Sequence, residues 1–370
     1  MRARETCAAD PFAAEAMADP YPALERLRSE SPVAWHERGM WIVTPHAEVS
    51  ALLRDPRYQH WRGKEGGDGA RESLAAHFGV TPRQSMREIV RRRAASLLEP
   101  LAGRGVRVEL MREYAHPLTF SIAAELCGIP GHEIPSLSDL AVALDCNVLL
   151  ALQPDRLPEP MRSAATELRR RIEAALETTS SRSIGVAIRT HAGDKRAAAA
   201  AMLIVLYAGH RNMMNAIGNA VVALDRHPGV LAQVQRMPQL LDRGVHELLR
   251  YDSPLQYISI VGRETALICG QRIEAGDEIL LAIGAANRDP FVFRDPNSIA
   301  LNRYPNQHLS FGIGSMRCPG SYTAVAELSA ALEALFTILP SLRVDGPVEW
   351  LSEPLAQRGP AAVFLRLGNA

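Results

Sequence analysis

The sequence predicts a mainly α-helical protein with small β-sheets, and three observations support this fold class. Helical periodicity of apolar residues dominates the chain from Tyr21 to Leu339. Residues 195–226 form the longest helix candidate, which is almost free of charge over its first half. Residues rich in Ile and Val, typical of strands, are concentrated at 40–44 and 256–281.

In the first half of the chain, residues 21–30 predict an amphipathic helix, and Met-Trp-Ile-Val-Thr at 40–44 predicts a strand. A second helix is expected over 47–54, before an Asp-Pro pair. Residues 62–70 are rich in glycine and charge, so we expect a mobile surface loop there. The helical pattern returns at 84–98 with a dense basic face, and the chain stays mostly helical to about Thr190.

In the second half, a helix that is apolar on all sides, such as 195–226, belongs in the centre of a protein. His-Pro-Gly at 227–229 ends it. Another helix is expected over 238–251. Short strands follow within 256–281, with turns at Gly270 and Gly276. The last long helix is expected over 321–339.

Composition excludes several classes of function. Of 370 residues, 47% are hydrophobic and 22% charged, and Lys plus Arg equals Asp plus Glu at 41 each. A neutral chain argues against nucleic acid as a partner, because such binding depends on basic surfaces. Residues 1–20 do not resemble a signal peptide, and the longest apolar run, 197–209, is too short to cross a bilayer. We therefore expect a cytoplasmic protein without a membrane partner, folded as a single domain over residues 1–370.

The five cysteines are scattered along the chain, and they show neither a Cys-x-x-Cys pair nor a Cys/His cluster at zinc spacing. This pattern predicts reduced thiols, mostly buried, for all except Cys318.

Cys318 lies in the segment 311–320, Phe-Gly-Ile-Gly-Ser-Met-Arg-Cys-Pro-Gly, which we name the cysteine loop. Its glycines permit a backbone that approaches a flat ligand closely. The helix that follows would place Cys318 next to a helix N-terminus, which favours a thiolate. A thiolate is a strongly donating ligand for iron. The alternatives are a buried cysteine beside a glycine-rich turn and, less favoured because no Lys follows, a phosphate-binding loop.

The cysteine loop resembles the haem-binding signature of the cytochrome P-450 family, Phe-Gly-x-Gly-x-His/Arg-x-Cys-x-Gly. Glu247 and Arg250 resemble that family's Glu-x-x-Arg pair, which locks to an arginine matched here by Arg303. Ala-Asn-Arg-Asp-Pro at 286–290 and Asp-Pro-Phe at 10–12 also resemble bacterial members. The resemblance implies a P-450-like helical prism with haem b between the central helix and the cysteine loop.

The resemblance also implies the residues that bind the haem, with Cys318 as the axial ligand of its iron. The further cofactor-binding residues expected are Phe311, Gly312, Gly314, Arg317, Gly320, Arg87, Arg91, Glu247 and Arg250. Arg87 and Arg91 match the positions that pair with the haem carboxylates, although a solvated basic face is the simpler interpretation. Met316 replaces the usual His or Arg before the cysteine, with Arg317 one place later. Carried over by position alone, Tyr257, Ile258 and Trp61 would contact substrate.

The central helix departs from the family at its oxygen-activating positions. Ala-Gly-His-Arg-Asn at 208–212 places Arg211 where the family has an acid and Asn212 where it has threonine, after Gly209. A guanidinium group stays protonated and cannot act as a base. Protons could then come from substrate or water. Alternatively, peroxide could replace oxygen with Arg211 binding peroxide or a substrate carboxylate, the reaction could be oxidative coupling, or Arg211 could turn to a surface acid.

The resemblance implies an oxidative enzyme of bacterial specialised metabolism, with a small-molecule or carrier-bound substrate and a ferredoxin as electron donor. Residues 153–197 are short for the lid helices of the family, which suits a bulky or carrier-tethered substrate. The alternative function is a degenerate helper subunit that activates an enzyme such as a glycosyltransferase. Intact Cys318 favours catalysis. The sequence does not indicate the substrate, the oxidised position, the redox partner or the oligomeric state.

Overall fold

A computed structural model describes residues 6–60, 83–102, 107–179, 183–192, 194–351 and 356–367. The chain divides into two compact units. The first unit comprises Met1–Glu65, Asn219–Cys318 and Pro347–Ala362, and the second comprises Gly66–Gly218, Pro319–Gly346 and Val363–Ala370. That both units belong to one domain over residues 1–370 stays a prediction.

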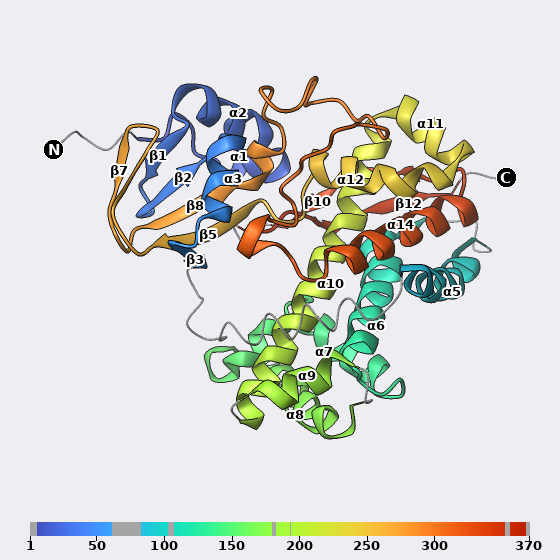
Figure 1. Ribbon diagram of the computed structural model, residues 1–370. Helices are drawn as coiled ribbons and strands as arrows, with labels where there is room; N and C mark the ends of the chain where they lie inside the picture. The colour runs from blue at the N-terminus through green and yellow to red at the C-terminus, as the bar shows by residue number, and fades with distance from the viewer. Residues whose placement is uncertain are drawn as a thin grey trace. The chain divides into compact units, whose positions relative to one another are not determined.

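The first unit combines a mixed β-sheet with helices (Figure 1). Its helical segments are α1 (Ala14–Ala18), α2 (Tyr21–Glu30), α3 (His46–Arg54), α11 (Pro228–Arg236), η4 (Pro238–Leu240), α12 (Leu241–Tyr251), α13 (Ile283–Ala286) and η5 (Gly314–Met316). Its strands are β1 (Val33–His36), β2 (Met40–Val43), β3 (Tyr58–His60), β5 (Tyr257–Gly262), β6 (Ala266–Ile268), β7 (Gln271–Ile273), β8 (Glu278–Ala282), β10 (Glu349–Trp350) and β11 (Pro360–Ala362).

The main sheet has the strand order β1-β2-β8-β5-β3. Strand β8 lies at its centre, parallel to β2 with Trp41 opposite Ile279 and antiparallel to β5 with Tyr257 opposite Ala282. The predicted strands at 40–44 and within 256–281 are therefore confirmed. Burial alternates along β5, because Ile258 and Ile260 point into the core on one face whereas Ser259 and Val261 on the other face are only partly buried.

Two hydrophobic clusters stabilise this unit. One joins Trp41, Leu53 and Leu281 with Met316 of the cysteine loop, and the other joins Phe12 with Tyr257. Trp41 is fully buried, and its indole Nε1 donates to Asp277 Oδ2 at 2.9 Å, so the ring does not leave an unpaired donor in the core. Burial of Met316 fixes one side of the cysteine loop to the sheet.

The second unit is almost entirely helical (Figure 1). Its helical segments are α5 (Arg83–Ala102), η1 (Met111–Ala115), α6 (His116–Leu126), α7 (Ile134–Val142), η2 (Val148–Leu152), η3 (Pro154–Arg156), α8 (Met161–Thr178), α9 (Ile184–His191) and α14 (Ser321–Ile338). Short strands β4 (Val108–Glu109), β9 (Arg343–Val344) and β12 (Phe364–Arg366) form a sheet in the order β4-β12-β9. The core joins α6, α7, α8, α9 and the first half of α10 through residues such as Leu137, Leu168, Ile172 and Leu203.

Helix α10 (Lys195–Asp225) confirms the predicted long helix; its residues up to Gly218 are assigned to the second unit and the rest to the first. It ends before Pro228, which begins α11, as the His-Pro-Gly signal predicts. Its first half is exposed at Ile204, which is 52% exposed. The same half packs on the core of the second unit through residues that include Met202 and Leu206.

The other predicted helices are also confirmed, because α2, α3, α5, α12 and α14 cover the segments that the periodicity indicates. The loop expected at 62–70 lies outside the described residues. Within the part of the chain that the structure describes, none of the helices combines the length and apolar character that crossing a bilayer requires.

Candidate functional site

The backbone of the cysteine loop is built on its two glycines. Gly312 and Gly314 both have φ of +62°, a conformation that side chains other than glycine rarely adopt. A Cβ atom on Gly312 would lie 2.5 Å from the carbonyl oxygen of Met316, and one on Gly314 would lie 3.0 Å from the Cα atom of Arg54. Both positions therefore exclude a side chain, as the sequence predicts.

The loop folds back at the cysteine. The main-chain N–H of Cys318 donates to the carbonyl oxygen of Phe311 at 2.7 Å. Cys318 forms no disulfide and is half-buried. Along the chain Cys318 precedes α14, whose N-cap residue is Gly320. An accessible thiol on a glycine-shaped loop is the donor that a haem iron requires, so the residues fit this cofactor.

The other cysteines correct the expectation from the sequence. None of the five cysteines forms a disulfide, and only Cys127 is fully buried, so the expectation of mostly buried thiols is wrong. Cys7 and Cys146 are half-buried, and Cys269 is exposed at the tip of the β6–β7 hairpin with φ of +46°. The turn geometry explains this exposure, because consecutive positive φ values at Cys269 and Gly270 are those of a two-residue hairpin loop.

Asn287 holds the start of the cysteine loop. Its Oδ1 accepts from the main-chain N–H of Leu309 at 2.7 Å, and its Nδ2 donates to Ser310 Oγ at 2.9 Å. Ser310 Oγ in turn donates to the carbonyl oxygen of Leu249 on α12 at 2.8 Å. All these groups are buried, so the amide fixes the loop entrance to α12.

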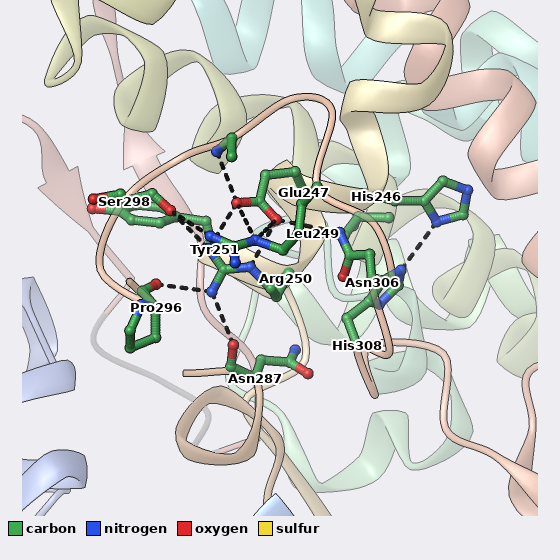
Figure 2. Close-up of polar contacts among 12 residues, drawn as sticks. His246, Glu247, Leu249, Arg250, Tyr251, Asn287, Pro296, Ser298, Asn306 and His308 are labelled. Atoms are coloured by element: carbon green, nitrogen blue, oxygen red, sulfur yellow. Dashed lines mark hydrogen bonds and ion pairs between the residues drawn. The ribbon is translucent and has the colours of Figure 1, made fainter. Parts of the chain in front are cut away.

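Glu247, Arg250 and Arg303 form one buried network, which Figure 2 shows in part. Arg250 Nε and Nη2 donate to the two oxygens of Glu247 at 2.8 and 2.9 Å. Arg303 Nε donates to the same carboxylate at 2.9 Å. The side chains of Glu247 and Arg250 are 1% and 0% exposed, so this pair differs from an ordinary surface i,i+3 pair. The structure thus brings together Glu247, Arg250 and Arg303, the three residues that the resemblance to the cytochrome P-450 family predicts to interact.

The same network organises the irregular segment before the cysteine loop. Arg250 donates to the carbonyl oxygens of Asn287, Pro296 and Ser298 at 3.0, 2.8 and 2.9 Å (Figure 2). Glu247 also accepts from the main-chain N–H of Ala300 at 2.9 Å. An irregular segment lacks the regular backbone hydrogen bonds of a helix or sheet, so these charged side chains form hydrogen bonds with its backbone groups instead.

A pair of histidines connects Phe311 to α12. His246 Nδ1 lies 3.1 Å from His308 Nε2 (Figure 2), and the His308 ring lies 5.8 Å from the ring of Phe311. Burial, with the nearby His246 and Arg250, lowers the pKa of His308 to about 3. His308 is therefore neutral at physiological pH, and it positions Phe311 by ring packing without adding charge.

Arg288 and Asp289 of the Asn-Arg-Asp motif have structural contacts that the sequence did not indicate. The Arg288 guanidinium lies between two rings, 3.3 Å from the centroid of Tyr21 and 3.9 Å from that of Tyr251. Asp289 Oδ2 accepts from the main-chain N–H of His46 at 2.9 Å. The motif therefore joins α2, α3 and α12 in the first unit. The only signal in the sequence is the clustering of charged residues beside apolar strands.

On α10, Arg211 is buried, which contradicts the possibility that it turns to a surface acid. Its Nη1 donates to the main-chain oxygen of Asp145 at 2.8 Å, in the turn that follows α7. Gly209 lies against α6, since a Cβ atom there would be 3.3 Å from the Cβ of Ala123. Asn212 is half-buried. The catalytic roles expected for Gly209, Arg211 and Asn212 stay predictions.

Arg87 and Arg91 on α5 share one partner that the sequence did not reveal. Glu333 Oε2 on α14 accepts from Arg87 Nη2 at 2.7 Å and from Arg91 Nη2 at 3.0 Å, and Arg87 Nη1 also donates to Ser329 Oγ at 2.6 Å. Glu333 is one of two acidic residues in the otherwise apolar α14, and this was the feature of the sequence that could have indicated an ion pair there. A haem carboxylate would have to compete with Glu333 for both arginines.

The expected substrate residues lie in packed surroundings. Tyr257 is buried with its ring 5.4 Å from that of Phe12, and burial raises the pKa of its phenol. Ile258 belongs to the neighbouring core cluster. Trp61 lies outside the described residues. In the cysteine loop, Arg317 is exposed while Met316 is buried. The roles of these residues toward substrate and haem stay predictions.

Comparisons with known proteins agree with one family. The family profile described as Cytochrome P-450 matches residues 190–339. The chain is 30% identical to the cytochrome P-450 monooxygenase PikC of Streptomyces venezuelae, over 94% of this chain and 91% of that protein. It is 28% identical to the biotin biosynthesis cytochrome P-450 of Bacillus subtilis, over 95% of this chain and 96% of that protein.

Solved structures agree on the fold. The crystal structure of CalO2 matches with a TM-score of 0.84 at 23% identity, over 98% of this chain and 99% of that chain. The structure of P-450BioI in complex with a hexadec-9Z-enoic acid-ligated acyl carrier protein matches with a TM-score of 0.83 at 24% identity, over 96% and 100% of the two chains. The relatives named as monooxygenases favour catalysis over the helper-subunit alternative. The chain therefore belongs to the cytochrome P-450 family, and it is an enzyme of the haem monooxygenase type.

Proposed function

We propose that Cys318 is the axial thiolate ligand of haem b and that the enzyme oxidises a specialised metabolite in a bacterial cytoplasm, with electrons from a ferredoxin. The observation that carries this proposal is the position of Cys318, half-buried and outside any disulfide, on a loop whose two glycines have left-handed backbones. When bound, the haem supplies oxygen activation, which a thiolate ligand promotes.

The chain's own residues would then hold and shape the cofactor site. Asn287 and the buried Glu247–Arg250 pair fix the segments that lead into the cysteine loop. Phe311 is positioned by His308. Gly312, Gly314 and Gly320 would keep side chains away from the cofactor, and Arg317 would bind a haem carboxylate. Arg87 and Arg91 would reach the other carboxylate if Glu333 shares them.

Proton supply is the step in which this chain departs from its family. A guanidinium group cannot act as a base, and the amide of Asn212 can donate a hydrogen bond but cannot relay a proton as a hydroxyl does. We propose that substrate or bound water supplies protons, and that Arg211, whose guanidinium already binds the carbonyl of Asp145, positions rather than protonates. The alternatives are peroxide use and oxidative coupling. Whether turnover needs an external reductant distinguishes them from the proposed oxygen- and ferredoxin-dependent reaction.

The substrate is proposed to be a small molecule or one tethered to a carrier protein. The similar solved structure of P-450BioI is a complex with a ligated acyl carrier protein, and the PksS relative of Bacillus subtilis is named for polyketide biosynthesis. Carrier-tethered substrates would suit the short segment between Gln153 and Ala197. Tyr257, Ile258 and Trp61 remain the proposed substrate contacts.

Carbon monoxide binding to the reduced protein tests the ligand assignment. We expect a strongly red-shifted thiolate band from the wild type, its loss in Cys318→Ser, and its retention in Cys7→Ser, which alters another half-buried thiol. Circular dichroism checks that the variants are folded. A thiolate band in Cys318→Ser would overturn the assignment. Absence of the band from folded, haem-supplemented wild type would overturn the proposed oxidation and lead to a search for a protein partner.

A further inference from the structure

Two histidines and a cysteine that lie far apart in the sequence meet inside the second unit. His116 begins α6, Cys146 follows the end of α7, and His210 lies on α10. One nitrogen of each histidine and the Sγ of Cys146 all lie within 4.8 Å of one another. We name these residues the His–Cys–His cluster. The cluster shares no residue with the cysteine loop.

The distances in the cluster approach those of a metal site. His116 Nδ1 lies 3.2 Å from His210 Nε2 and 3.3 Å from Cys146 Sγ. In a tetrahedral zinc site with Zn–N bonds of about 2.0–2.1 Å and Zn–S bonds of about 2.3 Å, neighbouring ligand atoms lie about 3.3–3.6 Å apart. Small side-chain movements would therefore place all three atoms around one ion.

Hydroxyl groups hold the outer nitrogen of each histidine. Thr119 Oγ1 donates to the carbonyl oxygen of Ala115 at 2.8 Å, so it accepts from His210 Nδ1, which is 2.9 Å away. The other nitrogen of His210, Nε2, then presents its lone pair to the cluster. Ser138 Oγ lies 2.9 Å from His116 Nε2 and can hold that ring in the same way. Such hydrogen bonds to the outer nitrogen are the usual support of metal-binding histidines.

The backbone directs the thiol into the cluster by an uncommon route. Asp145 and Cys146 have φ of +51° and +58°, in the left-handed region that non-glycine residues rarely adopt. The main-chain N–H of Cys146 donates to the carbonyl oxygen of Ala141 at 2.8 Å, which closes the end of α7. Such conformations cluster at functional sites, where the surrounding structure maintains them.

Zinc binding would release one proton. Neutral imidazole and thiolate are the forms that bind metal ions, so the ion would displace the thiol proton of Cys146.

We propose that the His–Cys–His cluster is a zinc site, with His116 Nδ1, His210 Nε2 and Cys146 Sγ as ligands and water in the fourth position. Imidazole and thiolate are the donors that Zn²⁺ prefers, and three protein ligands with water form a recurrent arrangement. The ion would join α6 and the turn after α7 to α10 directly beside Arg211, which donates to the carbonyl of Asp145 in the same turn. The proposal does not depend on haem ligation by Cys318.

Zinc binding to the full-length, haem-loaded protein tests this site. After chelator treatment, zinc chloride is titrated in competition with a chromogenic chelator. We expect about one equivalent of tight binding in the wild type and its loss in Cys146→Ser. Cys269→Ser is the matched control, because Cys269 is also a non-glycine residue with positive φ but is exposed. Iron content and circular dichroism verify that each variant keeps its haem and its fold.

X-ray absorption at the zinc edge of the wild type identifies the ligands without any substitution. One sulfur and two imidazole nitrogens would support the site, whereas an oxygen-rich shell, or equal binding by Cys146→Ser, would overturn it. Thr119→Val keeps the side-chain shape and removes the support of His210, so it should weaken zinc binding about 10–100-fold. Failure of the wild type to bind zinc would mean that the cluster is a hydrogen-bonded core, and the haem assignment would stand unaffected.

Discussion

The side-chain amide of Asn287 accepts the main-chain N–H of Leu309, at 2.7 Å, directly before the cysteine loop. The same amide donates to Ser310 Oγ. One buried side chain therefore fixes the backbone position from which the loop begins, and through Ser310 ties it to α12.

Asn287→Ala should destabilise the protein and loosen the cysteine loop. The substitution leaves a buried N–H and a buried hydroxyl with one partner fewer, at a cost of about 1–3 kcal/mol for each unsatisfied group. Urea unfolding would measure the loss, and the haem dissociation rate would report on the loop. The control is Asn302→Ala, an exposed residue of the same segment, for which a change within about 0.5 kcal/mol is expected. Equal effects of the two substitutions would contradict the assigned role.

Glu247→Gln should be among the most destabilising conservative changes in this chain. It leaves the buried charge of Arg250 and the largely buried charge of Arg303 without their carboxylate, and breaking such a buried network costs about 3–5 kcal/mol. The measurement is the free energy of unfolding in urea. Glu167→Gln provides a matched comparison, since Glu167 pairs with Arg170 at the same i,i+3 spacing on an exposed surface. If both variants lowered the free energy of unfolding by a similarly small amount, burial would add nothing to the contribution of the Glu247–Arg250 pair to stability.

Glu327 predicts a pH dependence of stability. Its carboxyl group is buried in α14, and Oε1 has no hydrogen-bond partner among the described residues. Burial raises its pKa well above the usual range, so the folded state keeps a proton that the unfolded state releases. The associated stability is complete below the unfolded pKa and is lost as pH rises toward the folded one, by up to about 1.4 kcal/mol per pH unit.

Glu327→Gln should remove this slope while preserving shape. In urea unfolding between pH 5 and pH 8, the stability of Glu327→Gln relative to the wild type should increase as pH rises. The control is the exposed Glu88→Gln, which should leave the pH dependence of stability unchanged. A slope that persists in Glu327→Gln would assign it to another group.

Glu333 and Arg87 allow the haem-carboxylate hypothesis to be separated from a purely structural ion pair. If Arg87 binds a haem carboxylate, Arg87→Gln should weaken haem binding, whereas Glu333→Gln, which releases the arginine, should preserve or strengthen it. Haem affinity from transfer to apomyoglobin is the measurement. If both substitutions lower only the unfolding free energy, the contact at 2.7 Å is structural and the predicted haem role is wrong.

Arg211→Glu combined with Asn212→Thr restores the residue types that the family uses for proton relay. We expect oxygen consumption to rise, because a carboxylate can release and accept protons near neutral pH where a guanidinium cannot. Asn212→Thr alone is the control, since it leaves Arg211 and its hydrogen bond to Asp145 intact. Collapse of product formation in the double variant would instead give Arg211 a direct part in substrate binding or chemistry.

Much of this protein was determined by its sequence alone. The helices α2, α5, α10 and α14 follow from apolar periodicity, and β5 and β8 from their Ile- and Leu-rich composition, because these signals are local. The cysteine loop could likewise be predicted, since its positive φ values fall at Gly312 and Gly314, where the sequence has glycine. The order of motifs along the chain was enough to indicate the family.

Which distant side chains meet follows from the folded chain and not from any local pattern. Glu333 pairs with Arg87 and Arg91, and the His–Cys–His cluster joins residues with no metal-binding spacing in the sequence. Helix periodicity specifies which face is buried, but it does not specify which neighbour covers that face. Burial also determines protonation. The sequence does not distinguish Glu327 from the glutamates on the surface, but in the folded protein the loss of water around Glu327 raises its pKa.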